Sequence, residues 1–305
     1  MTSAVPAPPR AESDDGSGTG VDTDSRTGTT DTPDAIDIGA LTAAAHPIRT
    51  GWTVLPARMV ALSIVELQKI RHDRSEIYSR AVTPLLWLAV FGETFTRIHA
   101  IPTGRIPYLA YLAPGIIAQS AMFIAIFYGI QIIWERDAGV LTKLMVTPTP
   151  RAALVAAKAF ASGAKAVVQA VVVLIMAAIL GAGMTYNPLK LLCVLLVVVL
   201  GSGFFSCLSM SIAGIVLTRD RLMGIGQAIT MPLFFTSSAL YPISVMPGWL
   251  QPLSRINPLT YEVDGLRSLL IGSPTDMPLD LAVLAGSTVL AVTVASKLLP
   301  RLAKG

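Results

Sequence analysis

The chain has 305 residues, of which 53% are hydrophobic and only 14% are charged, whereas a typical soluble domain has roughly 25% charged residues. This scarcity of charge and a mean hydropathy of +0.64 exclude an ordinary water-soluble fold. The formal net charge of +4 does not indicate nucleic-acid binding, because the basic residues lie between apolar runs and form no basic face.

The first 50 residues differ in composition from the rest of the chain. They carry eight acidic and three basic residues, set among Thr, Gly, Ser and Pro. Such a segment cannot bury enough apolar surface to offset the entropy lost on ordering. We therefore expect residues 1–50 to form a disordered, acidic cytoplasmic tail. No basic stretch followed by a short apolar run is present, so we expect no cleaved signal peptide.

Residues 51–79 have an amphipathic pattern. Leu55, Met59, Leu62 and Ile70 recur at helical spacing, and Trp52 stands at the start. This pattern is typical of a helix that lies in the membrane interface. We predict such an interfacial helix here, with a cytoplasmic helix packed on protein as the alternative.

Runs without charged residues predict the membrane spans. Four long charge-free runs cover residues 106–134, 166–189, 191–218 and 222–254. Two weaker apolar runs cover 81–96 and 281–299, each interrupted by one charged residue, Glu93 and Lys297. A spanning helix needs about 20 apolar residues. We therefore predict an all-α integral membrane protein with six transmembrane helices over residues 80–300. Prolines inside the run 222–254 argue against a seventh span.

The basic residues indicate the orientation of these spans. With the N-terminus inside, fourteen Lys and Arg residues fall on the cytoplasmic side and five on the outer side. Cytoplasmic loops are enriched in basic residues. We expect a multi-pass protein of the plasma membrane whose N-terminus and C-terminal residues 301–305 are both cytoplasmic.

The loop between the second and third spans combines charge with an apolar face. It begins with three charged residues, continues through Gly139 and an apolar face, and stops at Pro148 and Pro150. We predict a short cytoplasmic helix that docks on a soluble partner, with a loop lying on the bilayer as the alternative. The residues expected to couple to that partner are Glu135, Arg136, Asp137, Gly139, Leu141 and Leu144.

A second segment, between the fifth and sixth spans, interrupts an apolar stretch on the outer side. A helix is expected to resume at Tyr261, with Asp264 and Arg267 three residues apart. The segment either enters the bilayer and returns or lies on its surface. As the residues of an outer gate we single out Pro247, Trp249, Asn257, Pro258, Tyr261, Asp264 and Arg267.

Motifs for catalysis are missing from the sequence. It contains no P-loop, and its three histidines lie in separate polar segments without metal-ligand spacing. We expect neither an enzyme nor a metal site in this chain. Ionisable residues are scarce in the spans, which disfavours ion-coupled transport. Lys165 and Lys158 share a helical face and are expected to extend their ammonium groups into water.

An uncharged passage through the spans is the remaining candidate site. We assign to it Gln119, Phe123, Phe127 and Phe234, which could accept the apolar surface of a substrate. Ordinary helix packing explains the same residues and stays open as the alternative. Gln169 and Gln227 are interpreted as hydrogen-bonding partners of neighbouring helices.

Two motifs carry a resemblance to a known family. One is Glu135-Arg136-Asp137 followed by Gly139 and the stretch 144–148; the other is the run 246–252 leading into Asn257-Pro258-Leu259-Thr260-Tyr261 and the stretch 264–267. With the six-span layout, the chain resembles the membrane subunit of a type 2 ABC exporter from about residue 58 to 299. It is most similar to permeases of the daunorubicin-resistance type.

The resemblance implies function and partners. The chain would be the permease of an ATP-driven exporter for an amphipathic drug, antibiotic or lipid-like molecule. It would pair with a second permease, as a homodimer or a heterodimer, and with two ABC ATPase subunits that bind ATP and Mg. The alternatives are a lipid or lipid-linked glycan exporter and a membrane anchor or assembly subunit that transports nothing.

Overall fold

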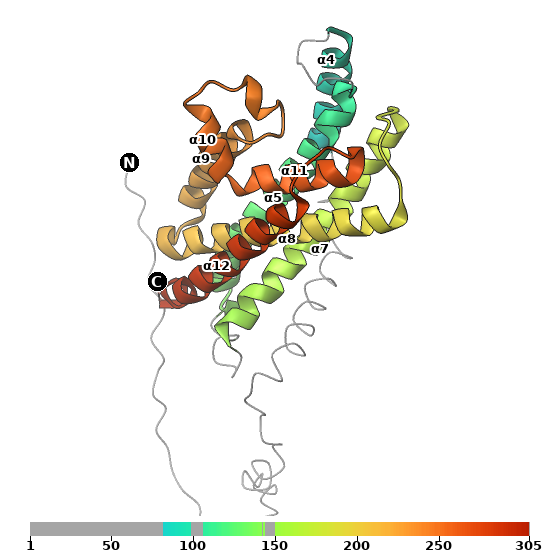
Figure 1. Ribbon diagram of the computed structural model, residues 1–305. Coiled ribbons are helices and arrows are strands. Elements are labelled where there is room, and N and C mark those ends of the chain that lie inside the picture. The colour runs from blue at the N-terminus through green and yellow to red at the C-terminus, as the bar shows by residue number, and fades with distance from the viewer. Residues whose placement is uncertain (1–81, 99–105, 142, 144–149, 305) are drawn as a thin grey trace, which may run out of the picture. The chain divides into compact units, whose positions relative to one another are not determined.

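The computed structural model describes residues 82–98, 106–141, 143 and 150–304, and every regular element in those stretches is helical (Figure 1). The all-α prediction is confirmed for this part of the chain. The expected tail over 1–50, the interfacial helix over 51–79 and the coupling residue Leu144 lie outside the described residues.

Four helices are long and apolar enough to cross a membrane. They are α5 (Tyr108–Asp137), α7 (Arg151–Ile179), α8 (Pro188–Val216) and α12 (Met277–Lys304), the last of which meets the criterion over Met277–Leu302. Helix α8 packs against the other three and against the shorter α11 (Pro258–Ile271). It is therefore the helix around which these spans are arranged (Figure 1).

The other two predicted spans are helical but shorter. The first is the apolar helix Val82–Thr96, whose middle is the π-helical segment η2 (Trp87–Gly92) and which runs on into α4 (Glu93–Ile98). The other is α9 (Arg219–Thr236), whose first three residues are all charged. Four of the six predicted spans thus correspond to helices of spanning length, and the count of six stays a prediction.

The boundaries of the third span differ from the prediction. The charge-free run 166–189 is not one helix, because α7 ends at Ile179 and Leu189 already belongs to α8. Helix α8 is capped by Asn187, whose side chain accepts a 3.0 Å hydrogen bond from the Leu189 backbone N–H. Pro188 is the first residue of the helix, a position that suits proline. The connecting turn carries no charge, so counting charges could not detect it.

The predicted break in the fifth span is also displaced. Pro232 lies inside α9, and the helix continues to Thr236, whose hydroxyl donates to the Pro232 carbonyl at 2.8 Å. The chain beyond α9 forms the short η3 (Ile243–Val245), then α10 (Leu250–Ile256) and α11. Helix α11 begins at Pro258, three residues before the predicted restart. Helix α12 likewise continues to Lys304, past the predicted end of the membrane domain at residue 300.

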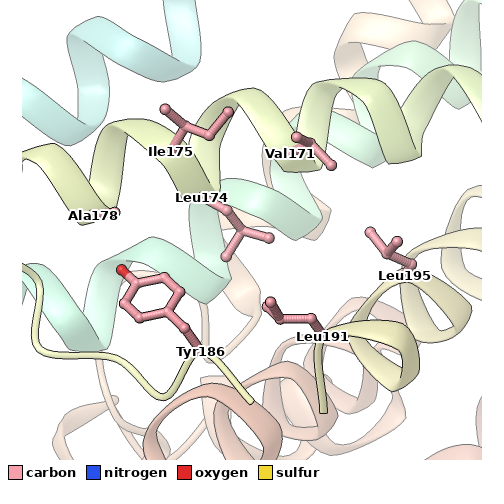
Figure 2. A pocket seen from close by; sticks show the side chains of 7 residues that line it. All are labelled: Val171, Leu174, Ile175, Ala178, Tyr186, Leu191 and Leu195. Carbon is pink, nitrogen blue, oxygen red and sulfur yellow. The ribbon is translucent and has the colours of Figure 1, made fainter. Parts of the chain in front are cut away.

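A wholly apolar groove lies on the outside of α7 and α8. Its volume is about 320 Å³, and Figure 2 shows its side chains arranged around an open space: Val171, Leu174, Ile175, Ala178, Tyr186, Leu191 and Leu195. Ile175 and Tyr186 are both exposed. An apolar surface of this kind on two spanning helices suits contact with lipid chains.

Candidate functional site

A cavity of about 700 Å³ lies between the helix Val82–Thr96, α5, α7 and α9. It brings together all four residues that the sequence assigned to an uncharged passage. Its walls are Thr83, Pro84, Trp87, Gln119, Ser120, Phe123, Ile124, Phe127, Gln169, Gln227, Met231, Phe234 and Phe235. None of these residues carries a charge.

Two helices contribute matching rows of side chains to the cavity. On α5 the row is Gln119, Phe123 and Phe127; on α9 it is Gln227, Met231 and Phe235. Residues four apart lie on one face of a helix. The sequence alone predicted only the row on α5. The row on α9 has the same spacing of four residues, and this spacing could have indicated it.

The cavity has a buried floor and an exposed rim. Phe234 is 1% exposed and contacts Trp87 edge-on at a centroid distance of 6.2 Å. Phe127 and Phe235 are 43% and 44% exposed. Trp87 comes from the π-helical segment η2, a geometry that is frequent at functional sites.

One amide in the cavity wall has an unused hydrogen-bond donor. Gln169 on α7 is 2% exposed, and its Nε2 has no hydrogen-bond partner among the described residues. A buried polar group without a partner is costly. The sequence alone suggested that Gln169 links neighbouring helices. In the structure Gln169 lines the cavity, and its Nε2 itself is buried.

The residues predicted for an outer gate lie partly inside the protein. Arg267 on α11 is 4% exposed and donates to the backbone carbonyls of Ser238 at 2.6 Å and Ala239 at 3.1 Å. Its guanidinium carbon lies 3.6 Å from the centroid of the Tyr111 ring, and Nη1 lies 3.4 Å from Asp264 Oδ1. Arg267 therefore fastens α11 to α5 and to the chain that follows α9.

Asn257 joins the same segment to the cavity wall. Its side-chain Oδ1 accepts from the Leu259 N–H at 3.0 Å and so caps α11. Its Nδ2 donates to the Leu233 carbonyl at 2.6 Å and to the Thr236 hydroxyl at 3.1 Å, both near the end of α9. Pro247 and Trp249, by contrast, are exposed.

The charged residues expected to open a coupling helix instead end α5. Glu135, Arg136 and Asp137 are its last three residues, and Gly139 follows in a left-handed turn with φ of 70°. This departs from the expected helix start, because the second span continues three residues beyond its apolar run. Leu141 is fully buried.

Two ion pairs at this end of α5 join it to other helices. Lys158 on α7 donates to Glu135 Oε1 at 2.8 Å, and both side chains are largely buried. The expectation that Lys158 extends into water is therefore wrong. Asp137 accepts from Arg136 at 2.8 Å and from Arg219, at the start of α9, at 2.6 Å. Arg219 also lies 5.6 Å from the centroid of the Trp134 ring.

Comparison with known proteins agrees with this architecture. The profile of the family described as ABC-2 type transporter matches residues 58–271, more than half of the chain. A protein named putative transport permease ycf38, from Cyanophora paradoxa, is 31% identical over 63% of this chain and 67% of its own length. The chain spans about two thirds of the length of the ycf38 relatives that it matches.

Two further relatives extend the comparison. The daunorubicin resistance ABC transporter permease protein DrrB1 of Streptomyces coeruleorubidus is 23% identical over 76% of this chain and 84% of its own length. Nodulation protein J of Rhizobium meliloti is 26% identical over 66% of this chain and 76% of its own length. With the family profile and the apolar spanning helices, these matches show that the chain belongs to the ABC-2 type transporter permease family.

Proposed function

We propose that the chain is the transmembrane permease subunit of an ATP-driven exporter that moves an amphipathic drug, antibiotic or lipid-like molecule out of the cell. The observation that carries this proposal is the uncharged cavity lined by two spanning helices, α9 and the helix Val82–Thr96. Aromatic side chains would hold the apolar part of the molecule, and the Gln169 amide, once its side chain turns towards the cavity, would donate to one of the molecule's oxygens. An ionised group would lose hydration there without gaining a counter-charge.

The energy would come from two copies of a separate ABC ATPase subunit, which would bind ATP and Mg. The chain has no P-loop of its own. The surface proposed to meet the ATPase is the end of α5 and the start of α9, where Trp134, Asp137, Val140 and Arg219 are accessible.

The helices offer a mechanical route from that surface to the cavity. Helix α5 carries the charged residues at its end and, about three turns earlier, Phe123 and Phe127 in the cavity wall. Helix α9 starts at Arg219 and carries the second row of cavity residues. Because Asp137 and Arg219 form an ion pair, a displacement imposed at this surface would move both walls of the cavity together.

A second permease would complete the transporter. The rim residues Phe127, Met231 and Phe235 are exposed apolar side chains at the mouth of the cavity. A second copy of this chain, or a related permease, would cover them. The segment 245–272 would then form the exit, held to α9 by Asn257.

The test is reconstitution of the full chain with a candidate ABC ATPase in lipid vesicles. Uncharged aromatic amphiphiles and lipid-like amphiphiles are added in separate arms, and ATP hydrolysis and efflux are measured. Replacing Phe123 with Ala should abolish stimulation by the transported class. Ile175→Ala, in the apolar groove outside the cavity, is the matched control and should keep it.

Failure would take a recognisable form. If the chain inserts in the membrane but never retains an ATPase, a non-transporting anchor becomes the better interpretation. If an ATPase binds and hydrolysis responds equally in Phe123→Ala and wild type, the cavity is not the substrate site. A response confined to the lipid-like arm would narrow the function to lipid export.

A further inference from the structure

Glu262 is a buried carboxyl group that the proposed function does not use. It lies on α11 and is fully buried. Neither of its side-chain oxygens has a hydrogen-bond partner among the described residues. Nearly all buried polar side chains in proteins are hydrogen-bonded, so a buried carboxyl with both oxygens unpaired requires an explanation.

Helix α8 is shaped to receive this carboxyl group. Gly201 of α8 faces it so closely that a Cβ at that position would collide with the carboxyl carbon and both oxygens of Glu262. Four residues earlier, Val197 of α8 faces Gly265 of α11 in the same contact. The glycine therefore leaves room for a polar group where two helices pack.

Among the described residues, no charged group pairs with Glu262. The titratable residues on α11 and on the adjoining parts of α5, α8, α10 and α12 are Tyr108, Tyr111, Lys190, Cys193, Cys207, Arg255, Tyr261, Asp264, Arg267 and Asp280. Asp264 and Arg267 pair with each other, and the Tyr108 and Tyr111 hydroxyls donate to backbone carbonyls. Burial alone raises the pKa of Glu262 well above its ordinary value.

We propose that Glu262 is a proton-binding site: it holds a proton while α11 is packed on α8 and releases it to water when the two helices separate. On separation the carboxyl O–H bond breaks, the proton passes to water, and the carboxylate becomes hydrated. The link to transport rests on the proposed function, in which α11 belongs to the exit segment. Opening of the exit would then release one proton for each chain.

The sign of the pH dependence follows from proton counting. The packed state binds one proton more than the separated state at any pH between the pKa of the exposed carboxyl, about 4.3, and the raised pKa of the packed one. Within that window each unit of rising pH favours separation about tenfold. Stability of the packed state is therefore greatest at low pH and is lost as the pH rises.

A labelling experiment on the full chain measures the separation directly. Cys193 and Cys207 are replaced with Ala, and Gly265→Cys puts a thiol in the contact between α11 and α8, where its Cβ has room. Maleimide labelling is followed from about pH 6 to pH 8 with Glu262 intact and in Glu262→Gln. The ratio of the two rates cancels the pH dependence of the thiol itself, and it should rise towards tenfold per pH unit.

Thermal unfolding of the otherwise unaltered chain gives a second readout. The midpoint of wild type should fall with rising pH relative to that of Glu262→Gln and of Glu262→Leu, neither of which can ionise. Asp220→Asn removes an exposed carboxyl at the start of α9, away from α11, and should leave the wild-type pH dependence unchanged.

Parallel pH profiles in wild type and Glu262→Gln would overturn the proposal. So would a wild type that gains stability relative to Glu262→Gln as the pH rises, because Glu262 would then be ionised and paired. Neither readout requires an ATPase. A proton site that passes both tests in a chain that never binds an ATPase would leave this inference standing while the proposed function fails.

Discussion

The cavity and the contact around Arg267 differ in whether their buried polar groups have hydrogen-bond partners. At the cavity, the Gln169 Nε2 has no partner among the described residues. The Arg267 guanidinium, by contrast, donates to the carbonyls of Ser238 and Ala239. It also pairs with the Asp264 carboxylate and lies over the face of the Tyr111 ring. An unpaired donor on a side chain that lines a cavity can turn to a ligand, whereas a fully paired cation is part of the protein's own framework.

Replacement of Arg267 should produce the largest effect. Arg267→Ala removes the cation that pairs with the Asp264 carboxylate, and removing one partner of a buried ion pair costs about 3–5 kcal/mol. It also removes the guanidinium that donates to the carbonyls of Ser238, Ala239 and Tyr111. Arg267→Lys should restore little, because an ammonium cannot reproduce the planar fork or the stacking on Tyr111. Thermal unfolding in detergent measures the loss. Arg255→Ala, an exposed site on α10, should change stability little, and equal losses at both positions would refute the framework role.

Breaking the buried ion pair between α5 and α7 should cause the second largest loss of stability. Lys158→Met removes the ammonium group that pairs with the largely buried Glu135 carboxylate, at a cost of about 3 kcal/mol. The double replacement Lys158→Met with Glu135→Leu should recover much of that loss, because the buried carboxylate is removed together with its ammonium partner. A double-mutant cycle by thermal unfolding gives the coupling energy. Additive losses would mean that the two side chains act independently.

Gln169→Leu should lower function without lowering stability. The substitution removes a buried amide nitrogen that has no partner among the described residues, and burying such a group costs about 1–3 kcal/mol, so stability should hold or rise. Stimulation of the ATPase by amphiphiles that carry a hydrogen-bond acceptor should weaken, while stimulation by purely apolar analogues should persist. A clear loss of thermal stability would show instead that the Gln169 amide binds helices together, as the sequence suggested.

Asp137→Asn should have the smallest effect on stability. Its ion pairs with Arg136 and Arg219 are partly exposed, and such pairs contribute little and weaken with salt. Transport is the more sensitive readout, because the proposed function uses this pair to move α5 and α9 together. Asp220→Asn, also at the start of α9, is the matched control. Unchanged efflux in Asp137→Asn would show that the ion pair between Asp137 and Arg219 does not couple α5 to α9.

The sequence predicted some of these features and missed others for identifiable reasons. The apolar runs predicted α5, α7, α8 and α12, and the spacing of Gln119, Phe123 and Phe127 predicted one wall of the cavity. It did not predict that Lys158 is buried. The local sequence around a lysine on an apolar helix is the same whether its ammonium group is hydrated or pairs with a distant carboxylate such as Glu135. Glu262 also escaped notice, since nothing beside it in the sequence marks it as buried.

The features that the sequence alone determined are local, because each depends on residues only a few positions apart in the chain. Helical character follows from the apolar runs, and the starts of α8 and α11 follow from Asn187-Pro188 and Asn257-Pro258. What the tertiary structure decided is which polar groups are paired. Lys158 pairs with Glu135, 23 residues away in the chain, and Arg267 donates to the Tyr111 carbonyl, 156 residues away. Such pairings, and the open donor of Gln169, exist only once the helices have packed, because burial and hydrogen-bond geometry are properties of the assembled bundle.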